Sequence, residues 1–227
     1  MKILVFSDTH LTDRFDQGKF RFLQKIINFS DQVIINGDFW DSWFTNFDDF
    51  VNSEWRKLFP ILLKKRAIYI YGNHDPARKR DSRASLFSVE QEEFYILTLA
   101  DQTYRIEHGS NILKGNRPKS IEIYSWFLNR IDKTILGRPV YQFLHFFEYL
   151  GYKLIGAPLM TGSKVARHLN EVMKQAGREE NFLICGETHC AEIDENARYA
   201  NSGCILYGTA SYLLLDENGV ALRRENF

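Results

Sequence analysis

The chain has 227 residues, and its 29 Lys and Arg balance 29 Asp and Glu, so its formal net charge is zero. This length suits a single domain, and 44% hydrophobic with 26% charged residues is an ordinary globular composition that argues against intrinsic disorder. A neutral chain lacks the basic excess that avid binding to a nucleic-acid backbone normally needs. Nucleic acid is therefore not the expected partner, although a local basic patch would be compatible with it.

The three cysteines, Cys185, Cys190 and Cys204, show no pairing pattern, which argues against a disulfide framework and for a reducing compartment. The apolar run at residues 3–6 is too short for a secretory signal. No apolar run approaches the length of a membrane span. We therefore expect a cytoplasmic protein with no transmembrane segment.

Short apolar runs alternate with helical periodicity in the first third of the chain. Three runs have the composition of buried strands: residues 3–6, 33–35 and 68–71. Residues 18–29 and 47–65 carry apolar side chains at helical spacing, and Pro60 is expected to kink or divide the second helix. This alternation predicts parallel strands joined by crossover helices.

The rest of the chain contains further strands on both sides of a helical stretch. The strands are predicted at residues 94–99, 103–107, 182–185, 204–207, 212–215 and 220–223. Residues 121–174 show the spacing of three helices, and residues 121–151 are unusually aromatic. We predict that residues 111–178 form a helical cap inserted within a single domain that spans residues 1–227. Such a cap would line a pocket or face lipid, or it would be a small hairpin with its own core.

Five of the predicted strands are followed directly by polar residues that can do chemistry. They are residues 8–10, 37–41, 72–75, 107–109 and 186–189, which read D-T-H, G-D-F-W-D, G-N-H-D, E-H-G and G-E-T-H. Ligands in α/β proteins bind beyond the carboxyl ends of strands, and carboxylate, amide and imidazole groups are metal ligands. Each segment alone is a weak signal, because turns are commonly polar. The ordered set of five predicts one metal-binding rim.

In this order the five segments resemble the signature of the calcineurin-like metallophosphoesterases, which reads D-x-H, G-D-x-x-D, G-N-H-[DE], x-H-G and G-H-x-H. The resemblance covers the chain outside residues 111–178. It implies a four-layer α/β fold, in which two facing mixed sheets are flanked by helices, with the inserted helical cap. It also implies hydrolysis of a phosphoester or pyrophosphate bond by a hydroxide that bridges two divalent metal ions.

The resemblance assigns metal ligands by position. One ion would be held by Asp8, His10, Asp38 and His189, and the other by Asp38, Asn73, His108 and Glu187, so that Asp38 is shared. Glu187 departs from the family, which has His there, and the alternative is that Glu187 points to solvent while water fills its place. The ions expected are two Mn²⁺, with Fe, Zn or Mg as alternatives.

Further residues are expected to act next to the metals. In the resemblance Asp41 orients His74, which would stabilise phosphoryl charge or protonate the leaving oxygen. Arg78, Arg80 and Arg83 follow closely and are predicted to bind further phosphate of a substrate. The alternative for these arginines is a solvated run of charge.

The position of the cap, between the x-H-G and G-H-x-H segments, resembles that in the UDP-2,3-diacylglucosamine pyrophosphatases. This implies a phosphorylated small-molecule or lipid-linked substrate, which is nucleotide-linked in that group, and peripheral membrane contact through the cap. Two alternatives stay open. One is a soluble phosphodiesterase or nuclease acting on nucleotides, and the other is a catalytically weak metal- or phosphate-binding protein that has lost the second metal site through Glu187.

Overall fold

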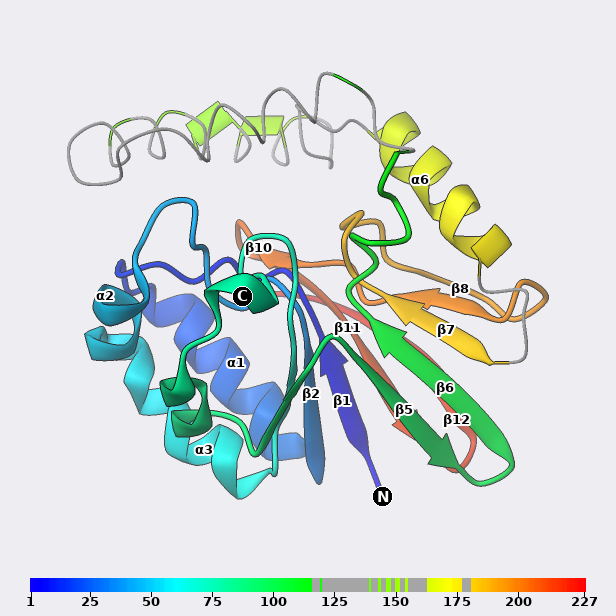
Figure 1. Ribbon diagram of the computed structural model, residues 1–227, viewed down its shortest axis with the longest axis horizontal. Helices are drawn as coiled ribbons and strands as arrows, with labels where there is room; N and C mark the ends of the chain where they lie inside the picture. The colour runs from blue at the N-terminus through cyan, green and yellow to red at the C-terminus, as the bar shows by residue number, and fades with distance from the viewer. Residues whose placement is uncertain are drawn as a thin grey trace.

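The computed structural model describes residues 1–115, 163–176 and 181–227, with isolated positions between residues 119 and 154. Two β-sheets face each other in this part of the chain, and helices cover the outer face of each (Figure 1). The predicted four-layer α/β arrangement is confirmed. The predicted cap over residues 111–178, including the helices expected before residue 163, lies mostly outside the described residues, so the cap stays a prediction.

The first sheet has seven strands and a parallel centre. Its parallel strands are β1 (Ile3–Phe6), β2 (Gln32–Asn36), β3 (Ile68–Ile70) and β4 (Glu90–Glu92). Its antiparallel strands are β10 (Ile205–Leu206), β11 (Thr209–Asp216) and β12 (Gly219–Asn226). The helices that follow β1 and β2 are α1 (Gln17–Phe29), α2 (Phe47–Asn52) and α3 (Phe59–Lys64). The parallel β1, β2 and β3 confirm what the alternation of apolar runs and helical spacing predicts.

The second sheet has five strands and is also mixed. In spatial order they are β5 (Phe94–Leu99), β6 (Gln102–Glu107), β7 (Phe182–Cys185), β9 (Tyr199–Asn201) and β8 (Glu192–Asp194). The central strands β6, β7 and β9 run parallel, whereas β5 and β8 are antiparallel to their neighbours. Helix α6 (Ser163–Ala176) packs Leu169 and Met173 against Leu183 of β7, which covers the outer face of this sheet.

Strand β1 shows how the layers are held together. Ile3 and Val5 belong to the apolar core between the two sheets, whereas Leu4 and Phe6 belong to the core under helix α1. All four side chains are fully buried, and each such burial contributes roughly 1.5–3 kcal/mol. The strand is apolar throughout because both of its faces are covered. That packing fixes the position of the turn that begins with Asp8.

The helix predicted over residues 47–65 is divided in three, because the 3₁₀-helix η1 (Glu54–Leu58) lies between α2 and α3. The first break is at Ser53, whose hydroxyl oxygen accepts a hydrogen bond from the Trp55 N–H at 3.3 Å. Pro60 lies in the first turn of α3, where its missing N–H sacrifices no helical hydrogen bond. The division expected from Pro60 is therefore found beside it, while the break at Ser53 has no signal in the hydrophobic spacing.

Strands β4, β8 and β9 are not predicted from the apolar pattern; β4 reads E-Q-E and lies at a sheet edge, where pairing with β3 alone makes it a strand. None of the three cysteines is in a disulfide bond. Among the described residues, no helix combines the length and the hydropathy that crossing a membrane requires.

Candidate metal centre

The predicted ligands lie on turns that follow strands of both sheets, and these turns meet at one end of the molecule. The ligands and the strands that lead to them are Asp8 and His10 after β1, Asp38 after β2, Asn73 after β3, His108 after β6, and Glu187 and His189 after β7. Nε2 of His108 lies 3.3 Å from Oδ2 of Asp38 and 4.0 Å from Oδ1 of Asp8. The rim is therefore a junction between the two sheets.

Four of the predicted ligands have a strained backbone. Asp8, His10, Asp38 and His189 have φ angles of 54°, 45°, 52° and 56°, which lie in the left-handed region. This conformation costs a non-glycine residue on the order of 1 kcal/mol, and it persists where the surrounding structure enforces it. The backbone strain thus falls on residues whose side chains have to turn toward one another.

Two glycines allow the turns to approach closely. Gly37 has a φ of +83°, and a Cβ there would lie 2.5 Å from the His108 ring. A Cβ at Gly72 would lie 2.1 Å from Oδ1 of Asp38. Any side chain at either position would therefore displace a predicted ligand.

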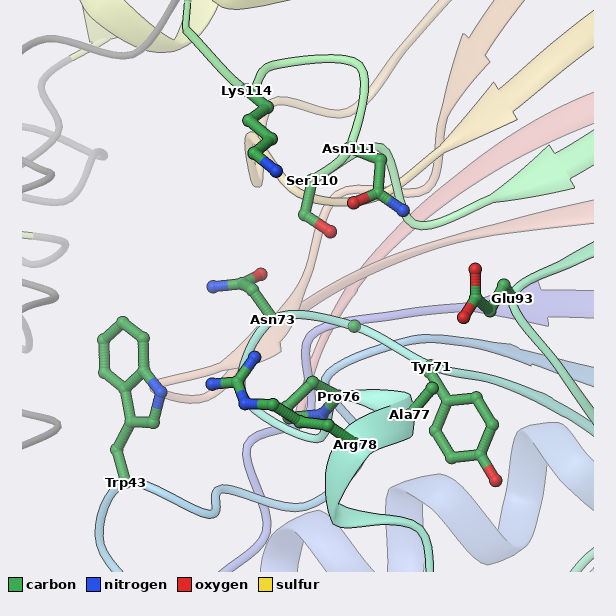
Figure 2. Close-up of a pocket in the computed structure, with 11 residues that line it drawn as sticks. Trp43, Tyr71, Asn73, Pro76, Ala77, Arg78, Glu93, Ser110, Asn111 and Lys114 are labelled. Carbon is green, nitrogen blue, oxygen red and sulfur yellow. The ribbon is translucent and has the colours of Figure 1, made fainter.

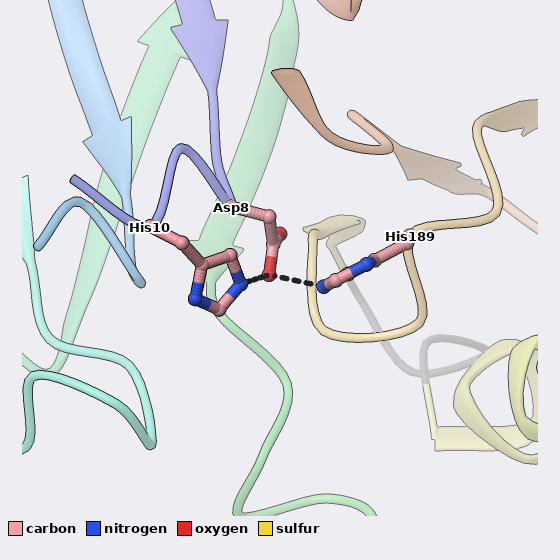
Figure 3. Close-up of side chains that lie close together, drawn as sticks. All are labelled: Asp8, His10 and His189. Atoms are coloured by element: carbon pink, nitrogen blue, oxygen red, sulfur yellow. Dashed lines mark ion pairs between the residues drawn. The ribbon is translucent and has the colours of Figure 1, made fainter. Parts of the chain in front are cut away.

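Asp8, His10 and His189 form the first half of the centre (Figure 3). Nε2 of His189 lies 2.9 Å from Oδ1 of Asp8, and Nε2 of His10 lies 3.7 Å from that oxygen and 3.8 Å from Oδ2 of Asp38. The other ring nitrogen of His10, Nδ1, is hydrogen-bonded to Oδ2 of Asp41 at 3.2 Å. In a neutral imidazole that donates through Nδ1, Nε2 carries a lone pair and is ready to bind a cation.

His108 is the centre of the second half. Its Nε2 lies 3.0 Å from Oε2 of Glu187, 3.1 Å from Oδ1 of Asn73 and 3.3 Å from Oδ2 of Asp38. Its Nδ1 is 2.8 Å from the carbonyl oxygen of Asn36, which likewise leaves Nε2 for a cation. Glu187 is directed into this cluster, and its side chain is only 11% exposed. This geometry disfavours the alternative in which Glu187 faces solvent.

Buried atoms without hydrogen bonds test whether these residues suit a metal. Both carboxylate oxygens of Asp8 and Nε2 of His10 are buried and have no hydrogen-bond partner in the described part of the chain; the approach of His189 to Asp8 lacks hydrogen-bond geometry. Buried carboxylate oxygens that accept no hydrogen bond are costly unless positive charge close by compensates for the lost hydration. A divalent cation would provide the missing interactions, and mixed carboxylate and imidazole donors suit such ions. The residues therefore fit a metal site.

Without metal, the pKa values of the cluster reflect the attraction between its carboxylates and its imidazoles. Burial opposes protonation of His10, but Asp41, Asp8 and Asp38 overcome it and raise the pKa of His10 to about 10. Burial likewise opposes ionisation of Asp38, yet the nearby His108 and His74 lower its pKa to about 2. The pKa of His108 is raised well above its ordinary value despite its burial, through Asp38 and Asp8. Protonated histidines thus neutralise the carboxylates where cations would otherwise do so.

Asp41 joins the predicted catalytic residue to a predicted metal ligand. Its Oδ1 lies 3.0 Å from Nδ1 of His74, and its Oδ2 lies 3.2 Å from Nδ1 of His10. The indole of Trp43 stacks on the His74 ring at a centroid distance of 3.6 Å. The pairing of Asp41 with His74 is predictable from the motif, but the contact with His10 requires the three-dimensional structure. Asp41 is thus hydrogen-bonded to His10 and lies at ion-pair distance from His74, whose Nδ1 has no hydrogen-bond partner among the described residues.

Asp75 braces the turns that carry the predicted ligands, a role that the sequence does not reveal. Its buried carboxylate accepts hydrogen bonds from the backbone N–H groups of Asp38 at 3.0 Å, Phe39 at 2.7 Å and Gly72 at 2.7 Å. Burial and the nearby charge of Asp38 raise the pKa of Asp75 to about 6. Asp75 thus holds together the turns after β2 and β3, and it acts on the ligands through the backbone.

A buried polar network on α6 supports the turn that carries His189. Oδ1 of Asn170 accepts hydrogen bonds from the hydroxyl groups of Thr188 at 2.5 Å and Tyr199 at 3.1 Å. Nδ2 of Asn170 donates to the carbonyl oxygen of Cys190 at 2.9 Å. Because Thr188 and Cys190 flank His189, α6 positions this predicted ligand. The contact has no signal in the sequence beyond the helical spacing of α6.

The three arginines predicted to bind substrate have different surroundings. Arg78 lines a cavity beside Asn73, whereas Arg80 and Arg83 do not line it. Arg83 is held by ion pairs with Asp48 at 2.6 Å and Asp81 at 2.8 Å. For Arg83 the structure therefore favours the alternative of a surface charge cluster.

Comparisons with known proteins agree with this fold. The family model of the calcineurin-like phosphoesterases matches residues 1–191, and the chain belongs to this family. A solved structure of a novel archaeal phosphodiesterase is similar with a TM-score of 0.50 and 18% identity, with 100% of both chains covered. Yfce, a phosphoesterase from E. coli, has a TM-score of 0.49 and 14% identity, covering 100% of this chain and 99% of its own. None of the curated proteins is significantly similar.

Together these findings define a calcineurin-like metallophosphoesterase, since the family match runs through all five motif segments. At 18% identity, the archaeal phosphodiesterase structure supports the fold alone. The His and Asp clusters are compatible with binding of divalent metals and with metal-dependent hydrolysis of phosphoesters. The individual ligands remain predictions that the geometry makes specific.

Metal binding to the metal-free protein is expected to release protons. The protons on His10, whose pKa is raised to about 10, and on His108 have to leave before Nε2 can bind an ion. Titration calorimetry with MnCl₂ at pH 7, in buffers of different ionisation enthalpy, should therefore show release of about two protons per chain. The exposed His168 provides the control, because His168→Ala should not change this number. Binding without proton release would contradict the assignment.

Restoring the family residue should alter the second half of the centre. Glu187→His replaces a negative ligand with a neutral one, which leaves more positive charge to acidify water, and nitrogen favours zinc over manganese. We expect more zinc retained after dialysis and a pH–rate profile that rises on the order of one pH unit lower. Glu187→Gln removes the negative charge but keeps an oxygen donor, so it distinguishes the effect of charge from the effect of ligand type. Identical metal content and identical profiles in Glu187→His and the wild type would show that Glu187 is not a ligand.

Proposed function

We propose that the protein hydrolyses a phosphoester or pyrophosphate bond of a nucleotide-linked or lipid substrate with two divalent ions, Mn²⁺ being favoured. The observation that carries this proposal is the buried cluster in which Asp8, Asp38, His10 and His108 direct oxygen and Nε2 atoms at one another. Asp8, Asp38 and His108 offer ligand atoms that all lie within 4.8 Å of one another, and carboxylates buried so close together are stabilised by positive charge between them. The predominance of oxygen ligands supports Mn²⁺ or Mg²⁺ over softer ions.

The chain divides its ligands between two positions that share Asp38. Asp8, His10 and His189 would hold one ion, while Asn73, His108 and Glu187 would hold the other. When bound, the pair supplies Lewis acidity that polarises a phosphoryl group and acidifies water. The family implies a phosphorylated substrate. The lipid or nucleotide part of that substrate is our inference from the resemblance of the cap.

His74 is positioned to act on the leaving oxygen. Asp41 lies at its Nδ1 and Trp43 stacks on its face, so the ring is held on two sides. Its Nε2 is directed at the cluster, 3.9 Å from Oδ2 of Asp38. In this orientation Nε2–H donates a hydrogen bond to phosphoryl oxygen or transfers its proton to the leaving group.

The predicted cap contacts an apolar part of the substrate or the cytoplasmic face of a membrane. Three described phenylalanines of this segment, Phe143, Phe146 and Phe147, are 63%, 57% and 40% exposed. Phe147 contacts both of the others, with ring centroids 4.7 and 5.8 Å apart. Exposed aromatic groups of this kind support contact with acyl chains of a substrate or a membrane surface.

Removing the shared carboxylate is the test of the proposed reaction. Asp38→Ala should lower Mn²⁺-dependent hydrolysis of bis-p-nitrophenyl phosphate by at least about 10²-fold, because both ions lose a ligand. Asp101→Ala, at an exposed turn, is the control that should keep the wild-type rate. A rate above about a tenth of wild type in Asp38→Ala would contradict the two-ion centre. Wild-type protein that binds metal without turnover would instead support the binding-protein alternative.

The role of His74 can be separated from metal binding. His74→Asn should retain bound metal and lower kcat by about 10²–10⁴-fold, the usual contribution of acid–base catalysis. His168→Asn changes an exposed histidine on α6 and should leave kcat unchanged. Metal analysis by mass spectrometry accompanies the kinetics. Loss of metal from His74→Asn would show that His74 is itself a ligand, contrary to the proposal.

A further inference from the structure

A cavity of about 410 Å³ opens directly beside the metal centre (Figure 2). Asn73, a predicted metal ligand, forms part of its wall, so a molecule bound at the metals would extend into this space. The volume lies in the range of small-molecule sites. The cavity lies between the turn after β3 and the segment after β6, and neither the metal ligands nor His74 account for its other residues.

Two cations from separate segments face the cavity. Arg78 lies on the segment after β3 and Lys114 on the segment after β6, and Figure 2 shows their charged ends on either side of Asn73. Neither side chain forms an ion pair with a carboxylate of the described residues. Both residues are exposed, so solvent screens their mutual repulsion, while an anion between them would be attracted by both. The arrangement therefore favours an occupant with substantial negative charge.

Trp43 adds an unsatisfied donor to the same wall. Its side chain is 7% exposed, and its buried Nε1–H has no hydrogen-bond acceptor among the described residues. In Figure 2 the nitrogen-bearing edge of the indole is turned toward Arg78. The same indole stacks on His74, so this donor lies close to the reacting position. An acceptor-rich ligand group would satisfy it.

The opposite end of the cavity has a different chemistry. Glu93 and Tyr71 lie there, away from Lys114 and Trp43 in Figure 2. A carboxylate and a phenol suit hydroxyl or amino groups and disfavour a second anion. The cavity therefore has a cationic end beside the metals and an acceptor-bearing end farther away.

We propose that the cationic end binds a second phosphate of the substrate, joined through an anhydride oxygen to the phosphate under attack. The preferred substrate is then a pyrophosphate-linked compound, and Arg78 and Lys114 select it over a simple diester. The planar guanidinium suits bidentate binding of phosphate oxygens. This inference rests on the proposed hydrolase function, and it names the substrate class of that site.

Water is the only co-reactant that this hydrolysis needs. Water adds a hydroxyl group to the attacked phosphorus, and the P–O bond of the anhydride breaks. The bridging oxygen leaves with the second phosphate and at low pH takes a proton from His74. The remaining proton of the water is released to solvent, and solvent returns a proton to His74. Arg78 and Lys114 stabilise the additional negative charge on this leaving phosphate, so they favour the products as well as binding.

The selectivity for a second phosphate is tested with two substrates in the presence of Mn²⁺. Diadenosine pyrophosphate contains the anhydride, and bis-p-nitrophenyl phosphate contains a single phosphate. Arg78→Ala and Lys114→Ala should each lower the ratio of kcat/KM for the first to kcat/KM for the second by about tenfold or more, as loss of a charge-assisted hydrogen bond implies. Arg21→Ala, at an exposed position of α1, should leave the ratio unchanged.

Arg80→Ala distinguishes a built site from a general effect of charge, because Arg80 lies two residues from Arg78 but outside the cavity lining. Its effect on the ratio should be less than about twofold. An effect equal to that of Arg78→Ala would overturn the proposal, and so would an unchanged ratio in both Arg78→Ala and Lys114→Ala.

A binding measurement distinguishes failure of this inference from failure of the proposed function. Calorimetry with α,β-methylene-ADP, whose two phosphoryl groups are joined by a methylene bridge that water does not cleave, measures affinity without turnover. Arg78→Ala and Lys114→Ala should each weaken its binding by about tenfold. Wild-type protein that hydrolyses neither substrate would contradict the proposed function. The titration would still show whether Arg78 and Lys114 bind a second phosphate. Unchanged affinity in both variants would overturn the inference.

Discussion

The burial of three carboxylates at the junction of the two sheets is the constraint on which this structure depends. Asp8, Asp38 and Asp41 are at most 2% exposed, and an ionised carboxylate removed from water costs several kcal/mol unless positive charge lies close by. In the metal-free protein His10 and His108 supply that charge, which explains their raised pKa values. A pair of cations would take over the same role with stronger interactions. Proton and metal therefore compete for one set of atoms, and the fold serves to keep that set together.

Holding the cluster requires backbone that an isolated chain would avoid. The left-handed conformations of Asp8 and Asp38 are maintained because rigid, fully buried strands precede them and because hydrogen bonds brace the turns. Asp75 ties the turn after β2 to the turn after β3, while Asn170 on α6 ties the turn of His189 to the outer layer. Strain at the ligands is offset by these buried hydrogen bonds, each worth about 1 kcal/mol. The same bracing places His74 and the neighbouring cavity at fixed positions relative to the predicted metal ligands.

The layers and the rim could be predicted from sequence because their signals are local. A strand covered on both faces, such as β1, is apolar throughout, and the residues that follow each strand carry a recognisable order of ligands. Features that join distant segments have no such signal, including the contact of Asp41 with His10, the bracing by Asn170 and the place of Lys114 in the cavity. Strand β4 is missed because its residues are polar and only its pairing defines it.

The central claim is that the cluster holds two ions that share Asp38. Anomalous diffraction from crystals grown with MnCl₂, collected at an energy above the manganese edge, tests it without relying on turnover. The account predicts two manganese peaks, one on each side of the Asp38 carboxylate, the first near Asp8, His10 and His189 and the second near Asn73, His108 and Glu187. A single peak, or manganese bound away from Asp38, would contradict it.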